Sequence, residues 1–458
     1  MNILDALHNL GERIRRVFTR AYWVEFWRSK RRMVVRGAIF GAVIHLLLIS
    51  HPTRLSAWAE DAALDWAMQN STALPRPTDP AFVFIDIDDA TMNAWPLVPY
   101  VPRDNLLQLI KYATNSEAIL VHVDVNVTRQ INPASITDPS QADKDLQQFL
   151  QAYSAPQPSG DPSSRRRPLL ILNREMQQTG NAADDCQEVR TSFLDDSVNV
   201  RTGFVEWGTV EFDVGPDQEV RFWRLWERAC KMIDRAEPSV EEVAAAYYQQ
   251  CRMVATPCIP KQPADLSLQH GNDISERVVY GIKWSPGNFP EVEVDGKKVP
   301  IVDVIQAKDI TEADPARPPS AELLRHRIVV IGGTAAFERD MHLTPVGEMP
   351  GALIIINAIY SLNRFQRLRY VNTAIEICVA LLLIAVASVL FAMLHHLWAF
   401  LLTGFLTIVV TLPLGLFAFH RGYWMDFAIP LLAVEAHHFL AEFEEAIRSG
   451  GKKREEGA

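Results

Sequence analysis

The feature that most constrains this chain is a nearly unbroken apolar stretch near its C-terminal end, from Ala374 to Leu440. It divides into three runs, each long enough to cross the hydrocarbon core of a bilayer as an α-helix. Short polar turns at His395-His396 and Arg421-Gly422 separate the runs, so we expect a tight antiparallel group of helices. The predicted spans are Asn372 to Leu394, Leu397 to His420 and Trp424 to Leu440.

A further span is predicted near the N-terminus, from Met33 to His51. A cleaved signal peptide also has a basic region followed by a short apolar run. We favour a retained anchor, because the basic segment is long and a helical pattern continues from Leu55 to Met68. Four spans place both termini on one side of the membrane, and the basic residues at both ends mark that side as the cytoplasm. The arginines that oppose this orientation are Arg364, Arg367 and Arg369.

The first 32 residues are rich in arginine and have apolar side chains at helical spacing. Because an apolar run follows directly, this pattern favours membrane anchoring over nucleic-acid binding. Two interpretations stay open, a helix lying on anionic lipid of the inner leaflet and a docking face for a cytoplasmic partner protein. The candidate partner-binding residues are Leu7, Leu10, Ile14, Phe18, Trp23 and Trp27.

Between Pro75 and Arg369 the sequence reads as a folded domain in which apolar strand-like runs alternate with helical ones. This alternation predicts an α/β domain with a mainly parallel sheet that is covered on both faces. Aromatic and β-branched residues from Thr202 to Trp226, with a turn signal at Gly215-Pro216, predict an added antiparallel hairpin. The segment from Gly351 to Leu362 reads as a helix leading towards the membrane. The predicted strands include Ala81 to Ile87, Ala118 to Val127, Leu169 to Leu172 and Arg327 to Ile331.

The predicted organisation therefore has five parts. A cytoplasmic basic segment (1–32) precedes the first transmembrane helix (33–51). A large extracytoplasmic domain (52–370) is followed by three transmembrane helices (371–440) and a short cytoplasmic tail (441–458). The ionisable residues of the C-terminal spans lie near helix ends, so we expect no ionisable group at mid-depth in the membrane. They are Glu376, Glu435, His437 and His438.

Polar residues gather at the C-terminal ends of the predicted strands. Asp86 and Asp88 share a face of the first strand, and His122 shares one with Asp124, because side chains alternate along a strand. Ligands of open α/β sheets bind beyond the carboxyl ends of parallel strands. The Gly332-Gly333-Thr334 loop could add backbone N–H groups for an anion. The candidate ligand-binding residues are Asp86, Asp88, Asp124, Thr334, Asp340 and His342.

Three interpretations of these residues stay open: caps of turns and loops, a ligand or cation site for sensing, and an acid/base pair of a hydrolase. No reactive nucleophile stands near them in the sequence, so no catalytic residue is assigned. Cys251 and Cys258, in the predicted exported domain, lack the paired CxxC spacing and the His partners of a zinc site. We therefore expect no metal and no cofactor.

The four cysteines of the predicted exported domain permit two disulfides, with three possible connectivities, or four unrelated thiols. They are Cys186, Cys230, Cys251 and Cys258. A fifth, Cys378, lies in a predicted membrane helix.

Several segments, taken in order, resemble one family. They are FIDIDD (84–89), WPLVPYVPR (95–103), VDV (123–125), TGFVEWGTVEFDVGPDQEVR (202–221) and RIVVIGGTAAFERDMHLTPVGEMPGALIIINAI (327–359), followed by three membrane helices. The chain from roughly Gly37 to Leu440 resembles the CHASE-two sensory domain, the extracytoplasmic module of bacterial receptors attached to cyclases and histidine kinases. The usual Asp-Gly turn is replaced here by Asp217-Gln218-Glu219. The most specific residues are the Gly-Gly-Thr loop with Asp340, Thr344-Pro345, Pro350-Gly351 and Asn357.

The resemblance implies a sensor in the bacterial cytoplasmic (inner) membrane, with the central domain in the periplasm or outside the cell. Family members commonly carry a kinase or cyclase after the last helix, whereas only Ala441 to Ala458 follow here, too few for a catalytic domain. We therefore expect a non-enzymatic sensor or receptor subunit, oligomeric and without nucleic acid. It would detect an unknown small ligand or periplasmic partner and signal to a separate cytoplasmic or membrane effector protein. The alternatives are a constitutive anchor or scaffold of a multi-protein complex and, ranked last, an extracytoplasmic hydrolase.

Overall fold

The computed structural model describes residues 19–50, 54–70, 76, 78–96, 100–130, 140–155, 167–178, 187–198, 204–230, 236–251, 275–313, 320–336, 340–365, 368–394 and 396–424. The chain forms two compact units. One comprises residues 68–368, and the other comprises the segments on either side of it. Each unit is described by itself.

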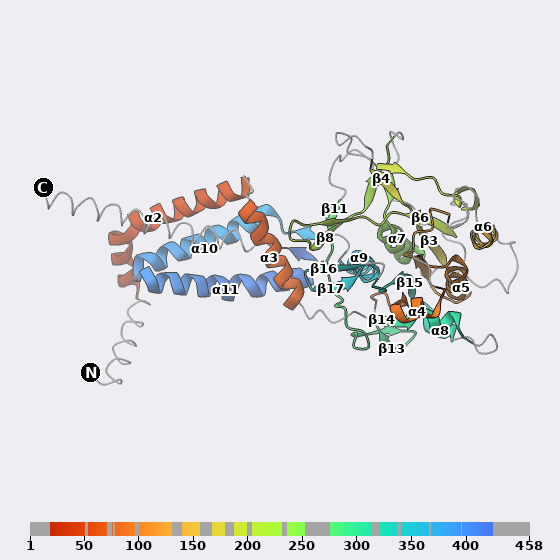
Figure 1. The fold of residues 1–458 in the computed structure, drawn as a ribbon. Helices are drawn as coiled ribbons and strands as arrows, with labels where there is room; N and C mark the ends of the chain where they lie inside the picture. Colours follow the sequence, from red (N-terminus) through yellow and green to blue (C-terminus); the bar gives the residue numbers. More distant parts are fainter. Residues whose placement is uncertain are drawn as a thin grey trace. The chain divides into compact units, whose positions relative to one another are not determined.

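A six-stranded sheet forms the centre of the 68–368 unit (Figure 1), and every neighbouring pair of its strands is parallel. The strand order is β14-β1-β15-β2-β3-β6. This confirms the predicted, mainly parallel α/β sheet. The strands are β1 (Phe82–Ile87), β2 (Leu120–Val123), β3 (Leu169–Asn173), β6 (Val205–Gly208), β14 (Val302–Gln306) and β15 (Ile328–Gly333).

Strand β15 comes last in the chain but lies in the middle of the sheet, between β1 and β2. On one side Ile328 is in register with Phe82, and on the other side Ile331 is in register with Val123. All six of its residues are buried. Such a strand is apolar on both faces because helices cover both sides of a parallel sheet.

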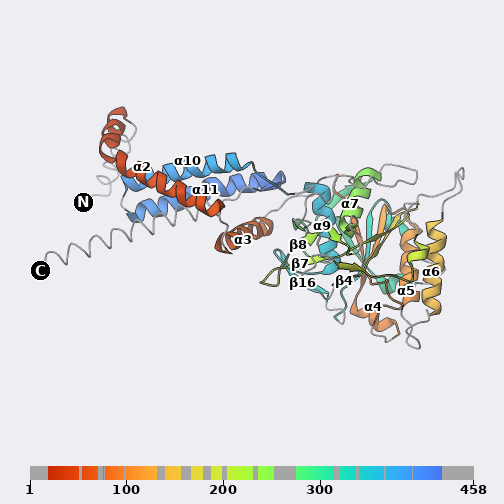
Figure 2. The ribbon, with the colours of Figure 1, turned by 90° about the horizontal axis from the view of Figure 1, so that it is seen from above.

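Different helices cover the two faces, as Figure 2 shows. On one face, α5 and α6 close a core that includes Ile85, Val121, Leu170 and Val329, with α4 and α8 at the end of that layer. On the other face α7 and α9 pack against each other and against the sheet. The helices are α4 (Asp89–Ala94), α5 (Arg103–Thr114), α6 (Gln141–Ser154), α7 (Val240–Cys251), α8 (Ala307–Thr311) and α9 (Gly351–Phe365).

The antiparallel hairpin predicted for residues 202–226 is present but shorter. It consists of β7 (Phe212–Val214) and β8 (Val220–Arg224), which β11 (Ser275–Arg277) extends to three strands. The beginning of the predicted segment instead forms β6 and pairs in parallel with β3. The reason is that Val205 and Trp207 are buried in the core of the parallel sheet.

Four two-stranded antiparallel elements complete this unit. The pair β16–β17 joins the end of β15 to α9 and carries Asp340 and His342 at its start. Their strands are β4 (Met176–Gln178) and β5 (Gln187–Val189), β9 (Trp226–Arg228) and β10 (Ala236–Pro238), β12 (Glu291–Val294) and β13 (Lys297–Pro300), and β16 (Met341–Thr344) and β17 (Gly347–Pro350).

The structure answers part of the question about the cysteines. Cys230 and Cys251 are disulfide-bonded, so the interpretation of four unrelated thiols is wrong. Cys186 and Cys258 lie outside the described residues. Within the described part of the chain, Cys378 is the free cysteine. Disulfides persist in oxidising compartments, so disulfide-bonded cysteines fit a domain outside the cytoplasm.

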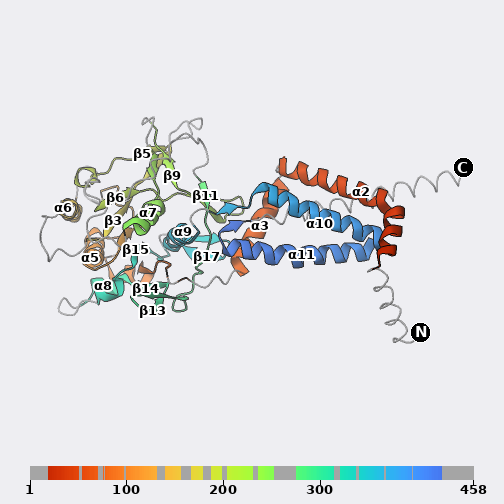
Figure 3. The same cartoon turned by 180° about the vertical axis from the view of Figure 1, so that it is seen from behind.

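In the other unit, Figures 1 and 3 show α2, α10 and α11 side by side. At the contact of α2 with α10, a Cβ atom on Gly41 would lie 2.7 Å from Cγ2 of Ile384, so a small residue permits the close packing. A short parallel pair, β18 (Arg369–Tyr370) with β19 (Tyr423–Trp424), also belongs to this unit. The helices are α2 (Arg20–Ser50), α3 (Arg54–Asn70), which runs on into the other unit, α10 (Thr373–Met393) and α11 (His396–His420).

By length and composition, two helices within the described residues could cross a membrane, Thr373–Met393 and Leu401–His420. They correspond to two of the predicted C-terminal spans. The predicted span at 33–51 belongs to α2, which continues without a break from Arg20. The predicted span at 424–440 lies outside the described residues except for Trp424, as do Leu7, Leu10, Ile14 and Phe18. Trp23 and Trp27 lie on α2.

One side chain of α2 was missed by the sequence analysis. His45 lies well inside the predicted first span and is fully buried, and neither ring nitrogen has a hydrogen-bond partner among the residues described. The expectation that no ionisable residue lies at mid-depth in the membrane concerned the C-terminal spans and did not include His45.

A buried ion pair joins the two ends of the 68–368 unit. Arg364, in the last turn of α9, donates a hydrogen bond to Asp79 Oδ2 at 2.6 Å, and it also contacts the hydroxyl of Tyr360. The side chains of Arg364 and Asp79 are 5% and 4% exposed. Asp79 precedes β1, so the pair ties the segment that enters the sheet to the helix that leaves it. Arg364, one of the arginines that oppose the predicted membrane orientation, thus has a structural role as the partner of Asp79.

Replacing Asp79 by alanine should leave the Arg364 guanidinium buried without its carboxylate. We expect Asp79→Ala to lower the free energy of unfolding by about 3 to 5 kcal/mol, measured by denaturant titration of the detergent-solubilised chain with tryptophan fluorescence. Arg325→Ala is the matched control, because Arg325 forms an exposed pair with Glu117 and should change stability by less than about 1 kcal/mol. Equal effects of the two substitutions would contradict the assigned role.

Candidate functional site

The carboxyl edge of the parallel sheet holds most of the residues proposed from sequence. Because all six strands run in the same direction, their carboxyl ends lie at one edge. Asp86 lies at the end of β1, Asp124 follows β2, and Thr334 follows β15. Since β15 separates β1 from β2, the candidates divide into two groups around this central strand.

The first group lies where β1 and β15 end. The Thr334 hydroxyl donates to both carboxylate oxygens of Asp86, at 2.8 and 2.9 Å. Burial raises the pKa of Asp86 to about 6, and the hydrogen bond from Thr334 opposes this rise. The backbone N–H groups of Thr334 and Ala335 donate to the carbonyl of Ile87. These two N–H groups are therefore occupied by the chain itself and are not free to bind an anion.

Asp88 has a structural role. Its carboxylate accepts a hydrogen bond from the Thr91 backbone at 2.7 Å and caps α4. The second carboxylate oxygen accepts from the Gln306 side chain at 2.9 Å, which links the end of β14 to this cap. For Asp88, the interpretation as a turn cap therefore accounts for the contacts in the structure.

The second group lies beside the start of α9. Asp340 and His342 form an ion pair, with Oδ1 of Asp340 3.0 Å from Nε2 of His342. Asn173, at the end of β3, donates to Asp124 at 2.9 Å. Burial and the nearby charge of Asp340 raise the pKa of Asp124 to about 7, while Asn173 and His342 lower it. The hydrogen bond to Asp340 raises the pKa of His342.

Two glycines allow the acids of the second group to lie close to α9. A Cβ atom on Gly351 would lie 2.5 Å from Oδ2 of Asp340, and the Gly351 N–H donates to the Asp340 carbonyl at 2.8 Å. A Cβ atom on Gly332 would lie 2.9 Å from Cβ of Ala352 and 3.3 Å from Cβ of Asp124. Larger side chains at either glycine would therefore displace the acids or the helix.

Two buried residues complete the second group and were not proposed as ligands. Glu241, at the start of α7, is 1% exposed, and its Oε1 has no hydrogen-bond partner among the described residues. Burial raises the pKa of Glu241 to about 8, and Asp124 contributes to the rise. His122 shares the strand face of Asp124, and burial lowers its pKa to about 3, so its ring is neutral. No sequence motif marks Glu241, because its partner Asp124 is brought close only by the fold.

The predicted meeting of all the acids is therefore only partly realised. Asp86 and Thr334 meet, and Asp124, Asp340 and His342 form a separate group with Glu241. Within the described residues there is no group of three or more His, Cys, Asp or Glu side chains placed to hold a metal ion.

These observations define a class of protein, an α/β domain with a polar sheet edge attached to apolar helices that fit a membrane. A family model, the CHASE2 domain, matches residues 39–393, and the chain belongs to this family. Domains of this family are extracytoplasmic sensory modules, which supports a sensor role and confirms the resemblance seen in the sequence. Comparisons with curated proteins and with solved structures find no match.

The raised pKa of Glu241 makes a prediction about stability and pH. Between its unfolded pKa, near 4.3, and its folded value of about 8, the folded protein holds a proton that the unfolded chain releases. Its contribution to stability is therefore present at low pH and is lost as the pH rises through this range. Glu241→Gln cannot ionise, so it should be more stable than wild type by about 1 to 3 kcal/mol above about pH 8, with the difference vanishing near about pH 4.

Thermal unfolding followed across this pH range would measure the effect. Glu291→Gln is the matched control, because Glu291 is an exposed residue of β12, and its curve should follow that of the wild type. If the stability of Glu241→Gln also followed that of the wild type at all pH values, the assignment of Glu241 as a buried, protonated carboxyl would be wrong.

Proposed function

We propose that this protein is a non-enzymatic sensor subunit of a bacterial inner membrane. A small extracytoplasmic ligand would bind at the carboxyl edge of the parallel sheet, and a separate effector protein would read the signal. The observation that carries this proposal is the position of Asp340 and His342 against the first residues of α9. The helix that begins at the candidate site is the same helix that precedes α10 in the chain.

The contacts of α9 support its role as a rigid connector. Every residue from Gly351 to Leu362 is buried. Asn357 fixes the middle of the helix, because its side-chain oxygen accepts from the N–H groups of Gly281 and Ile282 at 3.1 and 2.9 Å. The Arg364–Asp79 pair fixes the far end. A shift at the start of such a helix would be transmitted along it rather than absorbed by loose packing.

A ligand can move this helix only if it binds one arrangement more tightly than another. In the arrangement described, Asp340 pairs with His342 and also contacts Gly351. The proposed second arrangement is one in which a ligand takes Asp340 or His342 as its partner and thereby loosens the contact of Asp340 with the start of α9. The proposed response is a change in the packing of α10 with α2.

The proposed topology has four membrane spans, with residues 52–370 exported and both termini in the cytoplasm. Three features support it: the apolar helices α10 and α11, the disulfide-bonded Cys230 and Cys251, and the extracytoplasmic nature of the family. The basic N-terminal segment would then face the cytoplasm and offer the effector a docking face. We also propose a homo-oligomer, because in a dimer the membrane helices of neighbouring subunits could contact one another and change those contacts.

A cysteine at the first residue of α10 provides a probe for the proposed signal, because Thr373 is exposed and lies at the proposed outer surface of the membrane. In a Thr373→Cys, Cys378→Ser background, we expect Asp340→Asn, which removes the charge paired with His342, to change the maleimide reactivity of the new cysteine in spheroplasts by at least about twofold. The matched control is Asp295→Asn, since Asp295 forms a similar but distant and exposed pair with His326 at 2.8 Å. The control should react like the background variant, and Cys378→Ser alone gives the labelling to be subtracted.

An unchanged reactivity in Asp340→Asn would favour the constitutive anchor over the sensor. In that case α10 would be insensitive to the charge at the start of α9. A purification of the wild-type complex under mild detergent would then identify the partners that the anchor holds.

The topology makes a separate prediction. In a Cys378→Ser background, Asn288→Cys lies on an exposed part of the central domain and should react with an impermeant maleimide added to intact cells or spheroplasts. Ser449→Cys should react only after the membrane is permeabilised, because the C-terminal tail is proposed to be cytoplasmic. Protection of Asn288→Cys in intact spheroplasts would overturn the exported position of the domain.

A further inference from the structure

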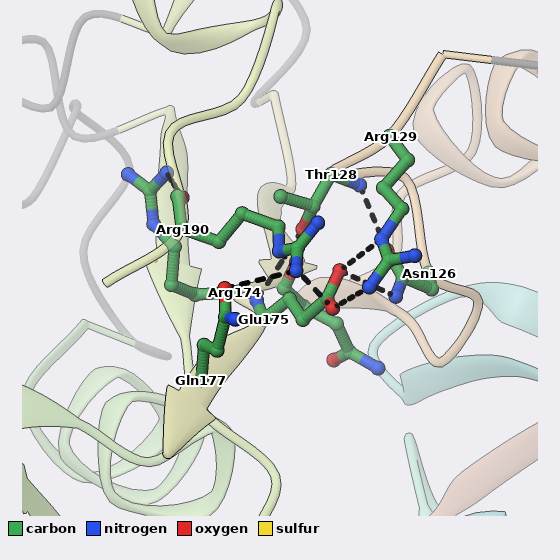
Figure 4. Close-up of polar contacts among 8 residues, drawn as sticks. Asn126, Thr128, Arg129, Arg174, Glu175, Gln177 and Arg190 are labelled. Atoms are coloured by element: carbon green, nitrogen blue, oxygen red, sulfur yellow. Dashed lines mark hydrogen bonds and ion pairs between the residues drawn. The ribbon is translucent and has the colours of Figure 1, made fainter. Parts of the chain in front are cut away.

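A group of charged side chains beyond β3 shows how a water-facing surface of this protein is built. Arg129 donates to both carboxylate oxygens of Glu175, and Arg190 Nε lies 3.2 Å from one of them (Figure 4). Charged residues are mostly exposed in folded proteins, and here they pair with one another. The helix α3 presents a different kind of surface.

The exposed face of α3 carries no charge. Trp58, which is 67% exposed, shares one face of the helix with Ala62 and Trp66, because these residues follow one another at intervals of four. The acids of α3 are not exposed and take part in interactions within the protein; they are Glu60, Asp61 and Asp65. Among the residues of α3 whose side chains are described, the exposed ones are Ala57, Trp58, Ala62, Trp66, Gln69 and Asn70.

The opposite face of α3 is already buried. Leu64, Ala67 and Met68 are at most 2% exposed. At the end of the helix, the Gln69 side chain donates to the carbonyl of Pro345 at 2.8 Å, in the turn of the β16–β17 hairpin. An amphipathic helix has one apolar face to bury against its protein, and α3 has buried that face. The tryptophan face is therefore a second apolar surface with an environment of its own.

The helix α3 starts at the end of the helical group at which α10 begins. Helices α2 and α10 are antiparallel, because Val34 shares an apolar cluster with Ala392, whereas Gly41, further along α2, lies against Ile384. Only residues 51–53 separate α2 from α3, and α3 turns away from the direction of α2 in Figures 1 and 2. Because α10 is apolar and long enough to cross a membrane, α3 starts where such a membrane would end.

We propose that α3 lies on the outer surface of the membrane, with Trp58, Ala62 and Trp66 among the lipid headgroups. Tryptophan is enriched at membrane–water interfaces, because its ring is apolar while its N–H group can donate to a polar acceptor. Helices that lie in the plane of the membrane place such an apolar face towards the acyl chains. The short connection from α2 to α3 favours lipid over another protein as the occupant of this face.

This inference goes beyond the proposed function, since it depends on neither a ligand nor an effector. In this arrangement α3 connects the membrane surface, through Gln69, to the hairpin that carries Asp340 and His342 at its start. The hairpin is then linked to the membrane by α3 as well as by α9. Contact with lipid also does not depend on which side of the membrane α3 occupies, so it is measured separately from the topology.

The accessibility of a nitroxide spin label tests the proposal. The full chain with Ala62→Cys, in a Cys378→Ser background, is labelled and reconstituted into vesicles of phosphatidylethanolamine and phosphatidylglycerol. Oxygen concentrates in lipid, whereas a nickel chelate present on both sides of the membrane stays in water. The ratio of oxygen to nickel accessibility at residue 62 should be several-fold higher than in the control Asn288→Cys, an exposed position of the central domain.

Substitution of the more exposed tryptophan provides the second measurement. Trp58→Ser should lower the ratio at residue 62 towards that of the Asn288→Cys control, whereas Trp58→Phe, which keeps an apolar ring, should leave the ratio close to that of its parent. The proposal is overturned if residue 62 is as accessible to nickel as the control. Exclusion of both reagents from residue 62 would also overturn it, because the face would then be covered by protein, such as a second copy of the chain. An unchanged ratio in Trp58→Ser, folded by its melting curve, would count equally against it.

Discussion

The position of β15 in the middle of the sheet is the constraint on which the rest of this structure depends. The sheet is incomplete until residues 328–333 insert between β1 and β2, so strands from the beginning and the end of the domain must come together. This insertion places Thr334 beside Asp86 on one side and Gly332 beside Asp124 on the other. It also fixes where α9 begins, because only a short hairpin separates β15 from that helix.

Two buried ion pairs help to hold this arrangement of strands and helices. The Arg364–Asp79 pair closes the end from which the chain leaves the domain, and the Arg103–Asp143 pair fixes the loop beyond β2. Glu241 is buried and Asp124 is partly buried, and neither forms an ion pair of its own among the residues described. Buried pairs add little net stability compared with apolar packing, but breaking one is expensive, so they favour one geometry over its alternatives. Asp124 and Glu241 are the opposite case, because burial raises the pKa of each carboxyl to about 7 and about 8, so their charge depends on pH.

The sequence was sufficient to predict the parallel sheet, because apolar runs such as Ala81 to Ile87 and Arg327 to Ile331 are characteristic of strands buried on both faces. The helix that begins at Gly351 was predicted from a similar apolar run. Strand order is not encoded locally, however, and so the sequence placed Asp86 and Asp124 in one site although β15 separates them. Residues 302–306 were not predicted to form a strand, because Asp303 and Gln306 interrupt the apolar pattern at this edge of the sheet. Glu241 was missed because its partner Asp124 lies far away in the sequence.

The arrangement of the edge also explains how one bound molecule could affect a membrane helix without any enzyme chemistry. The Asp340–His342 pair lies at the start of the hairpin that joins β15 to α9. In the proposed mechanism this pair need not move far, since a closely packed helix tends to shift as a rigid body. The buried Asn357 and Arg364 ensure that a displacement at Gly351 cannot be lost midway without breaking hydrogen bonds inside the core. In the proposed mechanism, the free energy available for signalling is limited by the difference in the ligand's affinity for the two arrangements of α9.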